Sequence, residues 1–520
     1  MAKASKTRAS KQSYISPSQL IIEGFETPFT QKLDATNRWV QLAHRIPWDS
    51  IVSIYETQMR NSVTGASHIN GRVVLGCIII KHTCGFSDEE TILQIQENMY
   101  MQYFIGYSSF SHEVPFDSSL FVEIRKRLGV ELLNAINNKI VELSTVVAKK
   151  EVSKPERNNA GDNNNPPTQE NSNNLTNPPL EEKKQEEEEG ITHKGKLLVD
   201  ATACPQDIAY PTDLNLLNDA REKSEELIDL IYVASLHGEK KPRTYREKAR
   251  EYYLTTAMKK NKSRKEIRRA IRKQLNYLQR NLSHIERLHQ AYKGKTTLDE
   301  RQQTYLYVIK ELYAQQRKMY DEKTHSIEDR IVSIHQPHVR PIVRGKQKSK
   351  VEFGAKIQLS LVAGYAFLDV LSWDAFNEGT MLLLAIENYK ARMGYYPKEV
   401  AADKIYCNRD NRKRLKEMGI TLKAKPLGRP KAVETEHVSP GERNPIEGKF
   451  GQAKARYGLG RIKARLSETS ESWIASIILV LNLVKLAGQV PFCLMVKWME
   501  NYLNYRMTKM KCLTFSVDPN

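Results

Sequence analysis

The amino-acid sequence predicts an α/β protein in which a mixed β-sheet is flanked by helices, interrupted by a helical insertion and preceded by an all-helical domain. Three observations support this prediction. Residues 37–150 carry apolar side chains at helical spacing, together with helix-start signals. Short β-rich runs occur at 196–205 and again between 339 and 424, where they first follow one another and then alternate with helices. A long helical stretch, over residues 214–335, separates the two groups of strands.

Composition narrows the functional classes. The chain has 520 residues, enough for roughly three domains. Its 80 Lys and Arg against 61 Asp and Glu leave a net charge of +19, which indicates a polyanionic partner, most commonly nucleic acid. An acidic protein surface or an anionic membrane would also explain the charge. The six cysteines form no CxxC pair, which argues against a zinc finger or a disulfide scaffold and favours a reducing cytoplasm.

The N-terminal part divides into three expected segments. Residues 1–36 are a basic, flexible leader without an apolar signal sequence. Residues 37–150 form the helical domain, in which Ser87 and Glu90 make a capping box and Trp48 packs in the core. Residues 151–190 are polar, rich in Asn and Glu, and almost free of large apolar side chains, so we expect a disordered linker.

The first β-rich run, Lys196–Pro205, is interpreted as an apolar strand that ends in the carboxylate Asp200, with 208–210 as its continuation or partner. The insertion over 214–335 follows it. Its middle contains nine cations and one acid, Glu266, in a short segment: Lys259, Lys260, Lys262, Arg264, Lys265, Arg268, Arg269, Arg272 and Lys273. Two interpretations stay open here. The segment either contacts DNA or is the solvated face of a helical hairpin that dimerises through Ile267, Ile271, Leu275 and Leu278.

The remaining elements complete the sheet. Strands are expected at 339–344, 355–362, 365–371, 399–403 and 420–424, and helices at 379–389, from near Asn408 and from near Asn444. Residues 191–213 and 336–492 therefore make up the sheet domain, and 493–520 a C-terminal tail. The apolar run 473–488 approaches the length of a membrane span, but Asn482 and Lys485 interrupt it. We interpret it as a helix buried in the protein core.

Three carboxylates are candidates for a catalytic site. Asp200 and Asp403 end predicted strands, and Glu447 lies early in the helix that begins near Asn444. Carboxylate oxygens are the ligands that Mg²⁺ prefers, and two such ions can support phosphodiester cleavage. Arg443 is four residues before the Glu and Lys454 seven residues after it, so all three share one helix face. The alternative for this face is an ordinary solvated set of salt bridges.

The ordered set resembles the DDE transposases of bacterial insertion sequences, which have an RNase-H-like catalytic core. The family's helix motif is Tyr, two residues, Arg, three residues, Glu, six residues, Lys, and this chain has Arg443, Glu447 and Lys454 at that spacing, with Pro440 in place of the Tyr. The stretches Leu198-Val-Asp200-Ala-Thr, Ala401-Ala-Asp403-Lys-Ile-Tyr and Tyr457-Gly-Leu-Gly-Arg461 are also similar to the family. The helical stretch from Trp48 to Gly129 resembles the domain that precedes the core in these proteins.

The resemblance implies a site and a reaction. Asp200, Asp403 and Glu447 would be the catalytic, metal-binding triad for two Mg²⁺ ions, with Mn²⁺ able to substitute. Arg443 and Lys454 would bind DNA, as would the insertion through Lys259, Lys260, Arg264, Lys265, Arg268 and Arg269. The expected activity is cut-and-paste transposition, in which a homodimer or larger assembly cuts the inverted repeats of its element and joins them to target DNA in the bacterial cytoplasm, at the nucleoid. The alternatives are an RNase-H-like nuclease or resolvase without strand transfer, and a catalytically inactive DNA-binding protein.

Overall fold

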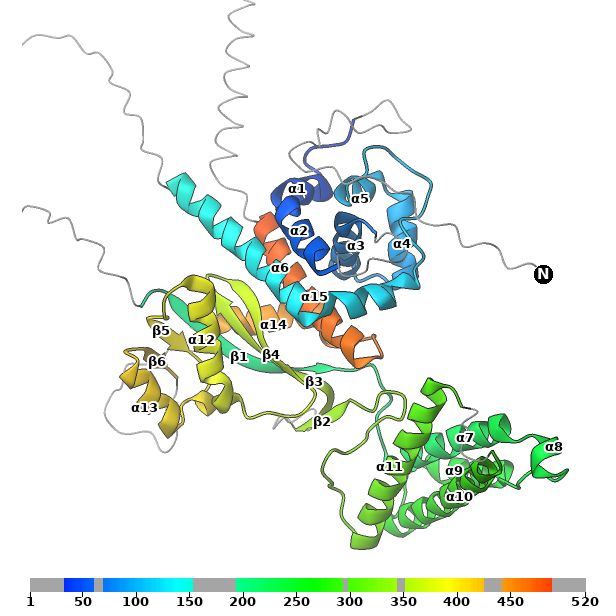
Figure 1. Ribbon diagram of the computed structural model, residues 1–520. Coiled ribbons are helices and arrows are strands. Elements are labelled where there is room, and N and C mark those ends of the chain that lie inside the picture. The colour runs from blue at the N-terminus through cyan, green and yellow to red at the C-terminus, as the bar shows by residue number, and fades with distance from the viewer. Residues whose placement is uncertain are drawn as a thin grey trace, which may run out of the picture.

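The computed structural model describes residues 32–59, 69–152, 193–292, 298–343, 351–424, 441 and 443–488. Figure 1 shows a sheet in the middle, a group of N-terminal helices on one side of it, and a second group of helices beyond one end of its strands. The predicted tail over 493–520 lies outside the described residues. So do almost all of the leader over 1–36 and the linker over 151–190.

The N-terminal part is all-helical, as predicted. Its helices are α1 (Arg38–Arg45), α2 (Trp48–Met59), α3 (Gly71–Cys84), α4 (Asp88–Glu97), α5 (Met99–Phe104) and α6 (Leu120–Val152). Local hydrogen bonds start several of them; the side chain of Ser87, for example, accepts a bond from the backbone N–H of Glu90. Trp48 is fully buried against these helices, which confirms its expected packing role. The backbone of Gly129 leaves helical geometry and bends α6 near its start.

The sheet has the mixed, RNase-H-like arrangement expected from the sequence. Its strands are β1 (Lys196–Pro205), β2 (Arg340–Val343), β3 (Val351–Val362), β4 (Tyr365–Ser372), β5 (Glu399–Ala401) and β6 (Thr421–Lys423). β3 pairs antiparallel with β1, β2 and β4, whereas β5 pairs parallel with both β1 and β6. β1 is therefore the central strand, at which the antiparallel half of the sheet meets the parallel half.

Two expectations about β1 were wrong. The strand does not end at Asp200 but continues to Pro205, because β3 pairs with it from Leu197 through Pro205. Residues 208–210 are not a strand. The pairing with β3 explains both differences. This long antiparallel partner bonds to the backbone of β1 beyond Asp200 and up to Pro205, which a local sequence pattern could not show.

Helices cover both faces of the sheet. One face packs against α14 (Asn444–Arg456) and α15 (Ser467–Gly488), in a core that continues into the N-terminal helices. The other face packs against α12 (Leu382–Met393), with α13 (Arg409–Glu417) close by. Short 3₁₀ turns, η2 (Glu378–Met381) and η3 (Lys404–Tyr406), lead into these helices. Side chains alternate along β1, so that Leu197 and Val199 join the α12 core while Leu198 joins the α15 core.

α15 is long and apolar enough to cross a membrane, yet 72% of its most apolar window is buried within the fold. Its polar residue Asn482 is completely buried and accepts a hydrogen bond from the backbone N–H of Ala366 on β4. The same side chain donates to Asn137 on α6 at 2.8 Å and to the carbonyl of Ala366 at 2.7 Å. Asn482 thus joins the N-terminal helices to the sheet, which confirms the prediction of a buried core helix.

The helical insertion between β1 and β2 has a core of its own. It consists of α7 (Asp213–Ile231), α8 (Ala234–His237), α9 (Arg246–Ala257), α10 (Arg264–Ala291) and α11 (Glu300–Glu322). Leu275 and Leu278 on α10 are completely buried against α7 and α11 within this chain. Leu275 and Leu278 are therefore unavailable as a dimer surface. Of the four apolar residues proposed for dimerisation, only Ile267 and Ile271 remain.

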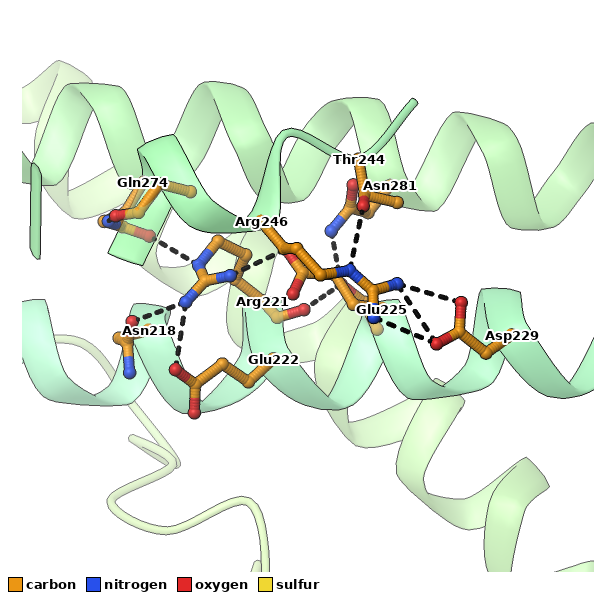
Figure 2. Close-up of polar contacts among 11 residues, drawn as sticks. Asn218, Arg221, Glu222, Glu225, Asp229, Thr244, Arg246, Gln274 and Asn281 are labelled. Atoms are coloured by element: carbon orange, nitrogen blue, oxygen red, sulfur yellow. Dashed lines mark hydrogen bonds and ion pairs between the residues drawn. The ribbon is translucent and has the colours of Figure 1, made fainter. Parts of the chain in front are cut away.

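A buried polar network holds α7, α9 and α10 in place (Figure 2). The guanidinium of Arg221, only 1% exposed, bonds to Glu225 at 2.6 Å, to Asn218 at 2.8 Å and to Gln274 at 3.2 Å. The amide of Gln274 continues the network by donating to the carbonyl of Ala249 on α9. Because each nitrogen of the Arg221 guanidinium has at least one acceptor, this buried charge is structural.

Candidate active site

Asp200 and Asp403 are neighbours because of the register between β1 and β5. These strands are parallel, and Leu198 pairs with Ala401, so the residues two positions further along each chain are level with each other. β5 ends at Ala401, and Asp403 follows it as the cap residue of η3 rather than as the last residue of a strand. Side chains along a strand alternate between its two faces. Asp200 is two residues after Leu198 and Asp403 two residues after Ala401, and both of those residues belong to the core that α15 covers. The two acids therefore lie on the sheet face that carries α14.

α14 supplies the third carboxylate. Pro445 occupies its first turn, where a proline fits without loss of a hydrogen bond, and Arg443 is the residue that precedes the helix. Buried Ile446, Phe450 and Ala453 form the stripe that packs α14 on the sheet. Glu447 lies next to this stripe in the first turn, at the edge that faces Asp200 and Asp403.

A single guanidinium contacts all three acids. Arg443 Nη1 donates to Asp403 Oδ1 at 3.0 Å and Nη2 to Asp200 Oδ2 at 3.1 Å. The same Nη2 lies 3.5 Å from Glu447 Oε1. The structure therefore brings together four of the five residues predicted for the core site, from three separate segments of the chain. Lys454 is half-buried on α14, two turns after the Glu.

The three carboxylates differ in environment. The side chain of Asp200 is 14% exposed, whereas those of Asp403 and Glu447 are 52% and 58% exposed. Burial raises the pKa of Asp200 from 3.8 to about 6, against the lowering effects of the Ala201 N–H and Arg443. The carboxylates of Glu378 and Asp403 raise it further. Burial thus makes Asp200 hold a proton more readily than an ordinary aspartate does.

Sequence reasoning missed the residues that surround Asp200. Glu378 lies in η2 and forms an ion pair with Lys356 of β3 at 2.9 Å. The buried hydroxyl of Tyr406 donates to Gln358 at 3.2 Å, and burial together with Glu378, Asp200 and Asp403 raises its pKa. Tyr406 ends the stretch Ala401-Ala-Asp403-Lys-Ile-Tyr that resembles the family, but its contact with Gln358 could not be read from that stretch. No local pattern marks Glu378, because only the tertiary fold brings η2 to the site.

The donor set fits a divalent metal by its chemistry. Three carboxylates offer hard oxygen ligands of the kind that Mg²⁺ and Mn²⁺ bind. In the arrangement described, however, the guanidinium of Arg443 takes their oxygens, and no group of three or more His, Cys, Asp or Glu within the described residues is spaced to hold a metal ion. Arg443 Nε is itself buried without a hydrogen-bond partner in this part of the chain.

The other acids considered near the site have different partners. Asp207 binds Arg461 at 2.9 Å, Asp213 binds Arg330 at 2.6 Å, and Asp369 binds Arg392 at 2.8 Å. Pro440 and Glu442 lie outside the described residues. The three proposed ligands are therefore distinguished from their neighbours by their common contact with Arg443.

The predicted DNA-binding residues of the insertion lie at the start of α10, away from the carboxylates (Figure 1). Glu266 takes one of the cations, Lys259, at 2.6 Å. Arg268 is half-buried over the ring of Tyr320, and Lys273 over that of Tyr252. The others are exposed: Lys260, Lys262, Arg264, Lys265, Arg269 and Arg272.

Comparisons with known proteins agree with this geometry. The family model for a transposase DDE domain matches residues 400–484, which include Asp403, Arg443 and Glu447. A second one, for the transposase domain DUF772, matches residues 27–127 in the N-terminal helices. The chain thus matches models of two transposase domains, one in its N-terminal helices and one in its C-terminal half.

A curated relative extends the comparison. The chain is 27% identical over 214 residues to a protein of Rhizobium meliloti named "Uncharacterized protein ORF8 in nfe locus", which covers 40% of this chain and 81% of that protein. No solved structure matches the chain. The two transposase-domain matches agree with the family expected from the sequence, and the mixed sheet with its flanking helices agrees with the expected fold class.

The raised pKa of Asp200 predicts a pH-dependent stability. The folded-state pKa of about 6 exceeds the ordinary 3.8, so protonated Asp200 stabilises the fold below about pH 4, and this contribution is lost as the pH rises through 6. Asp200→Asn removes the titration. We expect the free energy of unfolding of the variant, relative to wild type, to rise by up to about 3 kcal/mol between pH 4 and pH 7 in urea titrations.

Asp374→Asn is the matched control, because the Asp374 side chain is 79% exposed. Its difference from wild type should stay constant over the same range. A constant difference for Asp200→Asn as well would contradict the burial argument.

Proposed function

We propose that this transposase cuts the DNA at the ends of its element and joins the resulting 3′-hydroxyls to target DNA. The observation that carries the proposal is the contact of Asp200, Asp403 and Glu447, from three separate segments, with one guanidinium. Such a convergence of like charges has no stabilising purpose of its own, because each carboxylate raises the cost of ionising the others. It suits a site that binds cations and phosphate.

The three carboxylates are the proposed ligands for divalent metal ions, Mg²⁺ or Mn²⁺. A bound metal would supply Lewis-acid polarisation of the phosphate and lower the pKa of a water or hydroxyl nucleophile. The protein's own contribution is positional. The strands hold Asp200 and Asp403 level with each other, and the packing of α14 fixes Glu447 beside them.

The first test of this proposal removes the carboxylates one at a time. Asp200→Ala, Asp403→Ala and Glu447→Ala should each lower cleavage of a duplex carrying the DNA that flanks the coding region by at least about 10²-fold in Mg²⁺. DNA affinity should change little, because the cationic surfaces remain. Asp410→Ala, an exposed acid on α13, is the control and should cleave normally. Near wild-type cleavage by any triad variant would remove that residue from the site.

A nuclease or resolvase without strand transfer would use the same carboxylates. A pre-cut element end incubated with a plasmid separates the two activities. Joined products support the transposase, and cleavage without joining supports the nuclease. A catalytically inactive DNA-binding protein would give neither product, and it would gain nothing from a half-buried carboxylate held among other acids.

Arg443 is proposed to occupy the place of the metal ions, between the three carboxylates, while no DNA is bound. Its guanidinium neutralises the three acids, so a metal ion must compete with it for their oxygens. An entering phosphate offers the guanidinium another partner with bidentate geometry. Arg443 would then leave the carboxylates and bind the DNA. Its contacts with the acids and the DNA-binding role expected from the sequence would be two successive states of the same residue. Lys454, further along α14, is the second cation proposed to contact that DNA.

Arg443→Gln tests this competition without relying on activity. In the absence of DNA, the variant should bind Mn²⁺ about tenfold more tightly than wild type in isothermal titration calorimetry, a difference of about 1.4 kcal/mol. Arg409→Gln removes an exposed cation at the start of α13, which contacts none of the three acids in the described structure, and should leave Mn²⁺ affinity nearly unchanged. Equal or weaker Mn²⁺ binding by a folded Arg443→Gln protein would show that the guanidinium does not occupy the metal's place.

The exposed cations at the start of α10 are the proposed grip of the insertion on DNA. Exposed cations near a DNA backbone release counterions, so affinity depends on salt. Replacing Lys260 and Lys265 with Gln should flatten the slope of log affinity against log salt by about two units, if each contacts one phosphate. Lys310→Gln with Lys318→Gln, on α11 of the same insertion, is the charge-matched control. An unchanged slope accompanied by an altered oligomeric state in light scattering would instead make the segment an assembly surface.

A further inference from the structure

A basic cavity of about 280 Å³ lies apart from the carboxylates, between the N-terminal helices and the sheet domain. We call it the seam pocket. Its inner wall comes from α3, α4 and α6, and includes Lys81, Asp88 and Arg125. Its outer wall comes from the segment after α14 and the start of α15, and includes Arg461, Lys463 and Trp473. The left-handed backbone of Gly458 makes the turn that brings this segment to the cavity.

The inner wall buries more positive than negative charge. Lys81 and Arg125 are 2% and 5% exposed, and both bind the one carboxylate of this wall. Lys81 Nζ lies 2.9 Å from Asp88 Oδ1, and Arg125 contacts both oxygens, at 2.9 and 2.7 Å. Burial, Lys81 and Arg125 hold the pKa of neighbouring His82 well below its usual value, so His82 is neutral. One buried positive charge therefore has no counter-charge on this wall.

The outer wall adds to this excess. Arg461 is 70% exposed and binds Asp207 at 2.9 Å. Lys463 is also exposed, and no carboxylate among the described residues forms an ion pair with it. Counting Asp207, four cations around the seam pocket face two carboxylates. An uncompensated charge in a partly desolvated site is costly unless an anion joins it.

Two buried donors in the seam pocket also lack acceptors. Arg125 Nε and Trp473 Nε1 have no hydrogen-bond partner in the described part of the chain. The face of the Trp473 ring is covered, since Lys81 Nζ lies 4.7 Å and Arg125 Cζ 5.3 Å from its centroid. The N–H groups therefore remain for an acceptor that the protein does not supply. Unpaired buried donors beside excess positive charge are typical of a site for an oxyanion.

We propose that the seam pocket binds a phosphodiester group of the DNA backbone. This inference rests on the proposed function for the identity of the polyanion. The two walls belong to the two matched transposase domains, residues 27–127 and 400–484. A phosphate between them neutralises the excess charge and links the N-terminal helices to the domain that holds Asp403 and Glu447. DNA bound by the helical domain is thereby held in register with the catalytic carboxylates.

The double variant Arg461→Gln, Lys463→Gln tests the seam pocket while leaving the buried Lys81–Asp88–Arg125 group intact. Affinity for a fluorescein-labelled, mixed-sequence DNA duplex is measured by anisotropy at several salt concentrations in EDTA, so that no metal-dependent step contributes. The variant should bind more weakly and flatten the slope of log affinity against log salt by about one unit. Lys390→Gln with Lys398→Gln removes two exposed lysines elsewhere on the sheet domain and should keep the wild-type slope.

The emission of Trp473, obtained by subtracting the Trp473→Phe variant from wild type, distinguishes the source of the phosphate. The duplex should change this emission, and inorganic phosphate should compete with it. A response to inorganic phosphate that the duplex neither produces nor blocks would overturn the backbone assignment. So would an unchanged slope in the double variant while wild type still binds DNA. Wild-type protein that binds no DNA at all would overturn the proposed function itself.

Discussion

The repulsion between neighbouring carboxylates is the constraint on which the catalytic end of this structure depends. Parallel pairing of β1 with β5 places two acids side by side, and α14 adds a third. Without a cation among them, repulsion between the ionised carboxylates would destabilise this part of the sheet. Arg443 provides that cation from the residue immediately before α14, so the start of this helix and the arrangement of the acids are set together. The same contact explains how a site suited to metal ions can be stable before any metal binds.

Three arginines differ in how completely their guanidinium groups are hydrogen-bonded, and the difference follows their roles. Arg221 in the insertion has an acceptor for each of its guanidinium nitrogens, and its network joins three helices. Arg443 and Arg125 each leave Nε without a partner, and each lies where cations and carboxylates are out of balance. In a folded protein a buried donor without an acceptor is costly, and a bound ligand can supply the acceptor. Both incomplete arginines lie on surfaces that suit phosphate.

The domains of this transposase are joined through buried contacts rather than through their linkers. α15 packs against α6 on one side and against β4 on the other, and Asn482 bonds to both. The N-terminal helices are consequently part of the same core as one face of the sheet. The insertion, by contrast, has a core of its own and a separate polar network (Figures 1 and 2). Motion between the insertion and the sheet would therefore disturb few buried contacts, whereas motion of the N-terminal helices would break a common core.

The sequence by itself determined the identity and order of the elements. Helix starts at Ser87, Asn408 and Arg443 follow from caps and a first-turn proline, which are local interactions. Strand positions and the buried nature of α15 follow from apolar periodicity. The candidate triad followed from residue type and spacing, together with a resemblance to transposases. Only the tertiary structure decided that β1 runs on past Asp200, that Glu378 and Tyr406 lie beside it, and that Arg443 stands between three acids. The seam pocket likewise needed the fold, since its residues come from α3, α6 and the segment after α14. These features depend on contacts between residues far apart in the chain, and such contacts leave no periodic or local signal because they arise from packing and strand register.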